Sequence, residues 1–207
     1  ANDAYTSLAI AQLQMAARRY GPALARLRQA ESGLRDGAGE GVRLQITQMK
    51  ATCLQQTGQR EQARQHYERV LEQEPGNVNA LNNLAYLLTV EFDEPDRAME
   101  LAQRAANQTE DNGQILDTLG WAQFKAGQPH EARLTLQRSI ELEPMPYNHL
   151  HLGRVFMDLD VPVRARELLN KASQLAEESD NAEVARQAQQ WLKELSKLSQ
   201  QENQPQG

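Results

Sequence analysis

Histidine and cysteine, the side chains best suited to metal binding and nucleophilic chemistry, are few in this chain of 207 residues. The four histidines are His66, His130, His149 and His151, and Cys53 is the only cysteine. His149 and His151 are two positions apart, so on a helix they point to different faces. No two histidines have the i, i+4 spacing of a helical zinc site, and no histidine lies near Cys53 in the sequence. The pattern therefore predicts neither a metal site nor a cysteine nucleophile.

Two other segments share single features with ligand-binding loops. The acidic segment 91–96 lacks the glycine and the spacing of a calcium loop, so we interpret it as a solvated turn. Gly37, Gly39 and Gly41 alternate, but they do not follow a strand, as the glycines of a phosphate-binding loop do. The chain also has no Gly-x-Ser-x-Gly nucleophile motif. We therefore predict that the protein is not an enzyme and holds no cofactor.

The composition indicates helices rather than strands. Ala and Leu account for 27 residues each, whereas the strand-forming residues Val and Ile together account for 12. The formal net charge is −6 and the basic residues do not cluster, which argues against binding to nucleic acid or to anionic membranes. No apolar run approaches the roughly 20 residues that a transmembrane helix needs, and a single cysteine excludes an intramolecular disulfide. These features predict a soluble all-α protein.

Small residues recur along the chain at an interval of about 34 residues. The clearest set is five alanines spaced 40, 35, 34 and 33 residues apart: Ala23, Ala63, Ala98, Ala132 and Ala165. Gly58 and Gly127 each lie shortly before one of these alanines, where a left-handed backbone would end a helix. Pro75 and Pro144 lie where the following helix would end, because proline cannot continue it. Each interval therefore predicts two amphipathic helices joined by a short turn.

With these residues, and with the segments LNNLAYLL and LDTLGWAQFKAG, the chain resembles tetratricopeptide repeat (TPR) proteins of the bacterial type. The resemblance implies a right-handed α-solenoid of about five TPR helix-turn-helix repeats plus a C-terminal capping helix. The repeats would span residues 4–36, 44–77, 78–112, 113–145 and 146–179. One repeat cannot bury its own apolar face, so neighbouring repeats are expected to stack.

Four segments depart from the regular repeat. The linker 32–41 contains four glycines and is about six residues too long, which predicts a flexible loop. The turn of the third repeat carries one extra residue. Residues 181–198 place apolar side chains on one stripe and predict a capping helix, for which a partner-binding or dimerising helix is the alternative. Residues 199–207 contain no apolar side chain and predict a disordered tail.

The resemblance also implies where a partner would bind, because TPR proteins bind partners along the concave groove formed by the first helix of each repeat. In this register, seven residues would lie in the groove: Asn79, Asn82, Tyr86, Asp117, Trp121, Lys125 and Arg154. Amides can pair with the backbone of an extended peptide, and aromatic rings provide rigid contact area. The alternative for Tyr86 and Trp121 is that they pack against the neighbouring repeat as part of the core.

One known TPR ligand can be compared position by position. Some TPR domains grip the C-terminal carboxylate of chaperones with Lys, Asn, Asn, Lys and Arg. The matching positions in this chain are Gln48, Thr52, Asn83, Gln114 and Thr118. Only Asn83 agrees, and no cation is present at these positions to meet a carboxylate. A chaperone tail is therefore disfavoured as the ligand.

The leading hypothesis is a non-catalytic scaffold that binds a segment of a partner protein in the groove, without nucleic acid and without direct membrane insertion. The net charge of −6 favours a partner segment with some positive charge. The alternatives are a self-assembling component of a multiprotein complex in an envelope or secretion system, present as a homo-oligomer, or the regulatory repeat part of a larger protein. The chain lacks an initiator Met and is interpreted as a fragment or mature form, so cytoplasmic and bacterial periplasmic locations both stay open.

Overall fold

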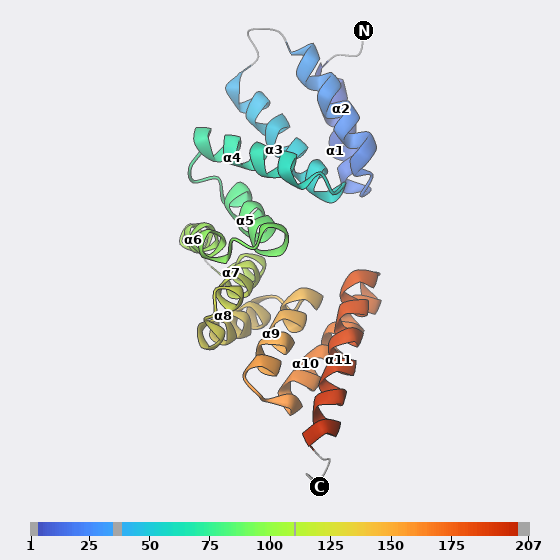
Figure 1. The fold of residues 1–207 in the computed structure, drawn as a ribbon. Coiled ribbons are helices and arrows are strands. Elements are labelled where there is room, and N and C mark those ends of the chain that lie inside the picture. Colours follow the sequence, from blue (N-terminus) through green and yellow to red (C-terminus); the bar gives the residue numbers. More distant parts are fainter. Residues whose placement is uncertain (1–3, 35–38, 110, 203–207) are drawn as a thin grey trace. The chain divides into compact units, whose positions relative to one another are not determined.

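Every described element of the protein is helical (Figure 1) in the computed structural model, which describes residues 4–34, 39–109 and 111–202. The elements divide after Asp93 into two compact units. The first unit contains α1 (Ala4–Ala16), α2 (Tyr20–Gly33), α3 (Glu40–Gln56), α4 (Arg60–Gln73), α5 (Val78–Leu87) and the π-helix η1 (Leu88–Phe92). The second unit contains α6 (Pro95–Ala106), α7 (Gly113–Lys125), α8 (Pro129–Leu142), α9 (Pro146–Asp158), α10 (Pro162–Glu178) and α11 (Ala182–Glu202). The predicted all-α fold class is confirmed.

Within each unit, consecutive helices pack against one another. In the first unit α1 packs on α2, α2 on α3, α3 on α4 and α4 on α5. In the second unit the same holds for each consecutive pair from α6 to α11, and α9 also contacts both α7 and α11. Contacts between helices that are one or two elements apart along the chain are typical of an α-solenoid built from helix-turn-helix units.

The turn inside each helical pair contains one residue with a left-handed backbone. These residues are Arg18, Gly58, Asp93, Gly127 and Asp160. In the turn at Gly127, with φ of 77°, the N–H of Gln128 donates to the carbonyl of Gln123 at 2.9 Å and so caps α7. A left-handed residue at this position is a common way to end an α-helix, and glycine adopts it without a Cβ penalty. The same left-handed backbone therefore recurs in all five turns, although only two of the five residues are glycine.

The extra residue predicted in the third repeat is accommodated by the π-helix η1. The N–H of Asp93 donates to the carbonyl of Leu88, five residues earlier. A π-turn holds one residue more than an α-turn, so it absorbs an insertion without ending the helix. The following helix starts with Pro95, whose missing N–H is tolerated in a first turn.

Paired helices cross closely at two glycines of the second unit. A Cβ added to Gly120 would lie 2.6 Å from Cγ of Leu136, and one added to Gly153 would lie 2.8 Å from Cδ2 of Leu169. These distances are shorter than van der Waals contact, so only glycine fits at this separation of the helix axes.

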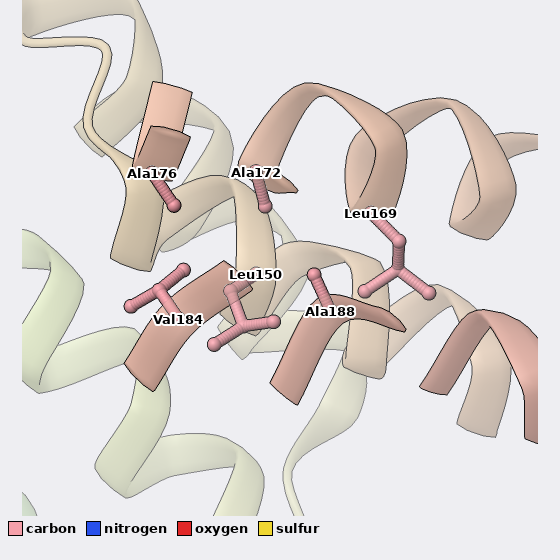
Figure 2. Close-up of a cluster of buried hydrophobic side chains, with 6 residues drawn as sticks. All are labelled: Leu150, Leu169, Ala172, Ala176, Val184 and Ala188. Carbon is pink, nitrogen blue, oxygen red and sulfur yellow. The ribbon is translucent and has the colours of Figure 1, made fainter. Parts of the chain in front are cut away.

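The last three helices share one buried cluster. Leu169, Ala172 and Ala176 of α10 face Val184 and Ala188 of α11, with Leu150 of α9 beside them (Figure 2). Most outward residues of α11 are polar or charged, for example the exposed Arg186 and Lys193, and Leu198 is exposed near its end. The helix therefore covers the apolar face of α10 with one side and meets water with the other.

The C-terminal boundary corrects one prediction. α11 continues to Glu202, so residues 199–202, predicted as the start of a disordered tail, are helical. Ser, Gln and Glu are all compatible with a helix, and the segment before Pro205 contains no residue that would end it. The rest of the predicted tail, residues 203–207, lies outside the described residues, as do residues 35–38 of the predicted flexible loop.

Candidate functional site

The second unit brings five aromatic rings together from α7, α9 and α11. The half-buried ring of Trp121 stacks on the imidazole of His151, with centroids 4.3 Å apart and planes 12° apart. Phe124, on the same helix as Trp121, stacks on that indole with centroids 5.2 Å apart. Trp191 of α11 lies 6.4 Å from Trp121, and Tyr147 of α9 lies 6.1 Å from His151. We call these five residues the aromatic cluster.

The aromatic cluster joins three helices. Trp121 belongs to α7 and Trp191 to α11, and both helices pack on α9. Side chains from the two flanking helices therefore converge over α9. Each aromatic pair contributes on the order of 0.5–1.5 kcal/mol beyond its buried area, so the cluster both stabilises this side of the unit and presents rigid, half-buried rings.

A buried polar pair lies beneath the ring of Trp121. The Nδ1 of His151 donates to Oδ1 of Asp117 at 2.8 Å, and the two side chains are only 7% and 11% exposed. This bond joins α9 to α7 and fixes the rotation of the imidazole on which Trp121 stacks. Asp117 therefore lies buried between α7 and α9.

Charged side chains border the aromatic cluster. Arg154 of α9 lies over the ring of Trp191 at 5.8 Å and reaches Oε1 of Glu194 at 3.4 Å. Arg154 is 30% exposed and Glu194 is 48% exposed, so this ion pair is wet and adds little stability. Lys125, in the last turn of α7, is exposed. The surface therefore combines an apolar centre with both signs of charge at its edge.

In the first unit, three predicted groove residues lie on α5. Asn79 is exposed and Tyr86 is half-buried. Asn82 is 9% exposed, and its Oδ1 is buried with no hydrogen-bond partner. A buried amide oxygen without a partner is costly.

A second set of polar side chains in the first unit joins α3 to α4. The buried Tyr67 of α4 donates its phenolic hydrogen to Oε1 of Gln55 at 2.8 Å, and its oxygen lies 3.3 Å from Oγ1 of Thr52. Burial raises the pKa of Tyr67 to about 12. The tyrosine therefore stays neutral and orients the side chain of Gln55 on α3.

Three of the predicted groove residues lie close together in the structure. The contacts between them run through His151 and Trp191, which were not predicted as groove residues. Asp117 and Trp121 meet at His151, and Arg154 meets Trp121 through Trp191. A sequence signal for His151 did exist, because Tyr147, His151 and Arg154 have the i, i+4, i+7 spacing of one helix face.

Metal binding and membrane crossing find no support among the residues with assigned positions. Within residues 4–34, 39–109 and 111–202, no group of three or more His, Cys, Asp or Glu side chains is placed to hold a metal ion. None of the described helices combines the length and the apolar character needed to cross a bilayer.

Comparisons with known proteins match the repeats. Residues 49–114 and 116–144 match two models of the tetratricopeptide repeat. A TPR repeat-containing protein of Pseudomonas aeruginosa is 32% identical over 84 residues, which are 41% of this chain and 14% of that protein. The chain thus spans a small part of the length of this relative.

Solved structures resemble most of the chain. MamA from Desulfovibrio magneticus RS-1 has a TM-score of 0.67 and 18% identity, over 87% of this chain and 98% of that one. A thermophilic TPR protein of Thermus thermophilus has a TM-score of 0.70 and 15% identity, over 89% of this chain and 98% of that one. At these identities the likeness shows the fold alone.

Proposed function

We propose that this chain, which is a tetratricopeptide repeat protein of the bacterial type, is a non-catalytic scaffold that binds a segment of another protein along its first helices. TPR folds generally mediate protein–protein interaction, which supports the class of function. The partner, and the surface that it occupies, are the proposal.

The observation that carries the proposal is the convergence of Trp121, Trp191 and Arg154 over α9. Tryptophan, tyrosine and arginine dominate the binding energy of protein interfaces when they are held rigidly and only partly exposed. Trp121 is held by its stack on His151, and Arg154 by Glu194 and Trp191. A partner would therefore meet these groups already ordered, which lowers the entropy lost on binding.

In the first unit, a segment of another protein would meet amide groups instead of aromatic rings. The exposed amide of Asn79 would donate to and accept from the backbone of a bound segment, and Asn82, 9% exposed, lies on the same helix. Neither amide carries charge, so this surface would read the backbone of the segment rather than its side chains.

A charge-reversal pair tests the proposal. Lys125→Glu changes the edge of the aromatic cluster, whereas Lys171→Glu makes the same change at an exposed position on α10, a second helix. Proteins captured from a lysate of the source organism by each variant and by the wild type are quantified by mass spectrometry. We expect a partner that is retained by the wild type and by Lys171→Glu but depleted by Lys125→Glu.

Asn79→Glu tests the first unit in the same way, and far-ultraviolet circular dichroism confirms that each variant is folded. A partner captured equally by all variants would place binding elsewhere and contradict the proposed surface.

A further inference from the structure

A cavity of about 440 Å³ in the second unit is lined by residues of α8, α9 and α10. Leu152 and Phe156 of α9 and Leu168 of α10 supply its apolar surface, whereas Arg164 and Lys171 of α10 supply cations. The volume falls within the range of sites that hold small organic molecules. Its lining residues differ from those of the aromatic cluster, so an occupant would be distinct from the partner segment proposed above.

The charged side chains that line this cavity leave it with one net positive charge. Arg164 binds the carboxylate of Glu167 at 2.9 Å, and that pair is neutral as a whole. Lys171 donates to the uncharged amide of Gln174 at 3.2 Å, so this contact does not balance its charge. Gln137, from α8, is also uncharged. A bound group with one negative charge would therefore neutralise the lining.

The cavity is also lined by a buried histidine, His149, which is 7% exposed. Its Nδ1 lies 2.9 Å from the carbonyl oxygen of Met145 and 3.0 Å from Oδ1 of Asn148. Both neighbours are hydrogen-bond acceptors, so Nδ1 carries the proton and Nε2 of the neutral ring carries the lone pair. Burial and the charge of Lys171 lower the pKa of His149, against the opposing effect of the bond to Met145. An anion beside the imidazole would act in the opposite direction and favour the protonated ring.

The repeat interval identifies the equivalent residues of the first unit. With the repeat alanines as the reference, Arg69 of α4 corresponds to Lys171 of α10, and Glu31 of α2 corresponds to Ile140 of α8. Both repeats therefore have a cation at the first of these positions. At the second position, the first unit has a carboxylate and the second unit has an apolar side chain.

In the first unit the carboxylate of Glu31 lies among cations. Its Oε2 accepts from Nζ of the buried Lys50 at 2.8 Å. Glu31 acts to raise the pKa of His66, whereas Lys50 and Arg69 act to lower it. Such effects weaken with distance, so these groups are close to one another. The chain thus already holds one carboxylate beside a histidine and a cation in this part of a repeat.

We propose that the cavity lined by α8, α9 and α10 binds a small organic molecule that carries one carboxylate and an apolar body. The carboxylate would lie beside His149 and Lys171, and the apolar body would lie on Phe156 and Leu168. This goes beyond the proposed function, because the site shares neither residues nor ligand class with the surface proposed for a protein partner.

The test uses benzoate as the probe and benzamide, an uncharged molecule of nearly the same shape, as its matched control. The pKa of each histidine in the full chain is measured by nuclear magnetic resonance from its Cε1–H signal, at constant ionic strength. We expect saturating benzoate to raise the pKa of His149 by about one unit, which corresponds to about tenfold tighter binding to the protonated ring. Benzamide should leave this pKa unchanged, and the exposed His130 should respond to neither compound.

Lys171→Gln removes the unbalanced cation at an exposed position, and it should lower the affinity for benzoate by at least about tenfold. Lys193→Gln, at an exposed position on α11, should retain the affinity of the wild type. An unchanged pKa of His149 in benzoate, an equal response to benzamide, an equal response of His130, or undiminished affinity in Lys171→Gln would overturn the inference. If N-acetylglutamate amide raises the pKa of His149 and benzoate does not, the occupant is an acidic side chain of a protein, and a small apolar carboxylate is excluded.

Discussion

The thiol of Cys53 is the most reactive group in the chain by type, and its surroundings suppress that reactivity. Cys53 is fully buried, and desolvation raises its pKa from 9.0 to about 11. A shift of this size leaves about one hundredth of the usual thiolate at a given pH, and the thiolate is the nucleophile. The residue is therefore part of the core, and it fills the position that Leu87 and Val155 occupy in other repeats.

We expect Cys53 in the folded protein to react with Ellman's reagent at pH 8 at least about 100-fold more slowly than an exposed thiol. The comparison is Cys53→Ala combined with Ser32→Cys, which moves the thiol to an exposed position on α2. In guanidinium chloride both proteins should react at the same rate. Equal rates in buffer would mean that the α3 region opens readily.

His66 links stability to pH in the first unit. Its pKa is lowered from 6.5 by burial and by the positive charges of Lys50 and Arg69, which outweigh the opposing effect of Glu31. Because the folded state holds the proton less tightly than the unfolded state, the contribution of His66 is fully present above pH 6.5. It is lost as the pH falls from there through the folded pKa.

We therefore expect the thermal midpoint of the protein to fall between pH 7 and pH 5, and to fall less in His66→Gln. His130→Gln, at an exposed position on α8, is the control and should retain the slope of the wild type. Measurement is by circular dichroism in buffers of equal ionic strength. The same slope in both variants would show that other groups carry the effect.

For the candidate site, the sequence predicts which helices carry the residues but not the contacts between those helices. The helical register could be derived from the alanine spacing, and it assigned Trp121 and Arg154 to first helices. The bond between His151 and Asp117 could not be derived, because it joins residues 34 apart and depends on the relative rotation of α7 and α9. Trp191 was predicted only as part of a capping stripe, and its contact with Arg154 depends on how α11 packs against α9.

At the scale of elements, the first helix of each repeat needs a small residue at the point where the second helix of that repeat crosses it. At Gly120 the nearest atom to an added methyl group would be Cγ of Leu136 at 2.6 Å, whereas Gly41 in α3 has no atom within 4 Å of such a group. The same substitution should therefore have opposite effects at these two positions.

Gly120→Ala should lower the free energy of unfolding by about 1–3 kcal/mol, because overpacking outweighs the gain in helix propensity. Gly41→Ala should raise it by about 0.5–1 kcal/mol, since it removes backbone entropy from the unfolded chain without a clash. Urea denaturation measures both. The cost of Gly120→Ala should largely vanish in a Leu136→Ala background, and its persistence there would assign the cost to another cause.

Turns and insertions show how far the sequence predicts elements. The glycines at 58 and 127 predicted two turns, but Arg18, Asp93 and Asp160 adopt the same left-handed conformation without being glycine. Their places were predictable only from the repeat interval. The extra residue of the third repeat was visible in the sequence, yet whether it would lengthen the turn or form the π-helix η1 depended on the packing of Leu88, which is fully buried.

At the scale of the whole molecule, the first and last helices differ in how they meet water. α1 has an exposed apolar face and no charge, whereas α11 has a mostly polar outer face and buries Val184 and Ala188 against α10. An α-solenoid needs a polar surface on its terminal helix to stay soluble. α11 meets that requirement and α1 does not.

Removal of α11 separates the capping role from the alternative of a dimerising helix. A chain that ends at Ser179 would expose Leu169, Ala172 and Ala176 of α10, and it would lose Trp191 from the aromatic cluster. If α11 is a cap, the truncation should lower the free energy of unfolding by roughly 3 kcal/mol or more through lost apolar burial and increase the binding of a hydrophobic dye.

A chain that ends at Leu198 should behave as the full chain does, because the buried residues of α11 are retained. If instead the full chain is a dimer and the truncated chain is a monomer of unchanged stability, α11 serves association rather than capping, because a covering helix cannot be removed without exposing the face beneath it.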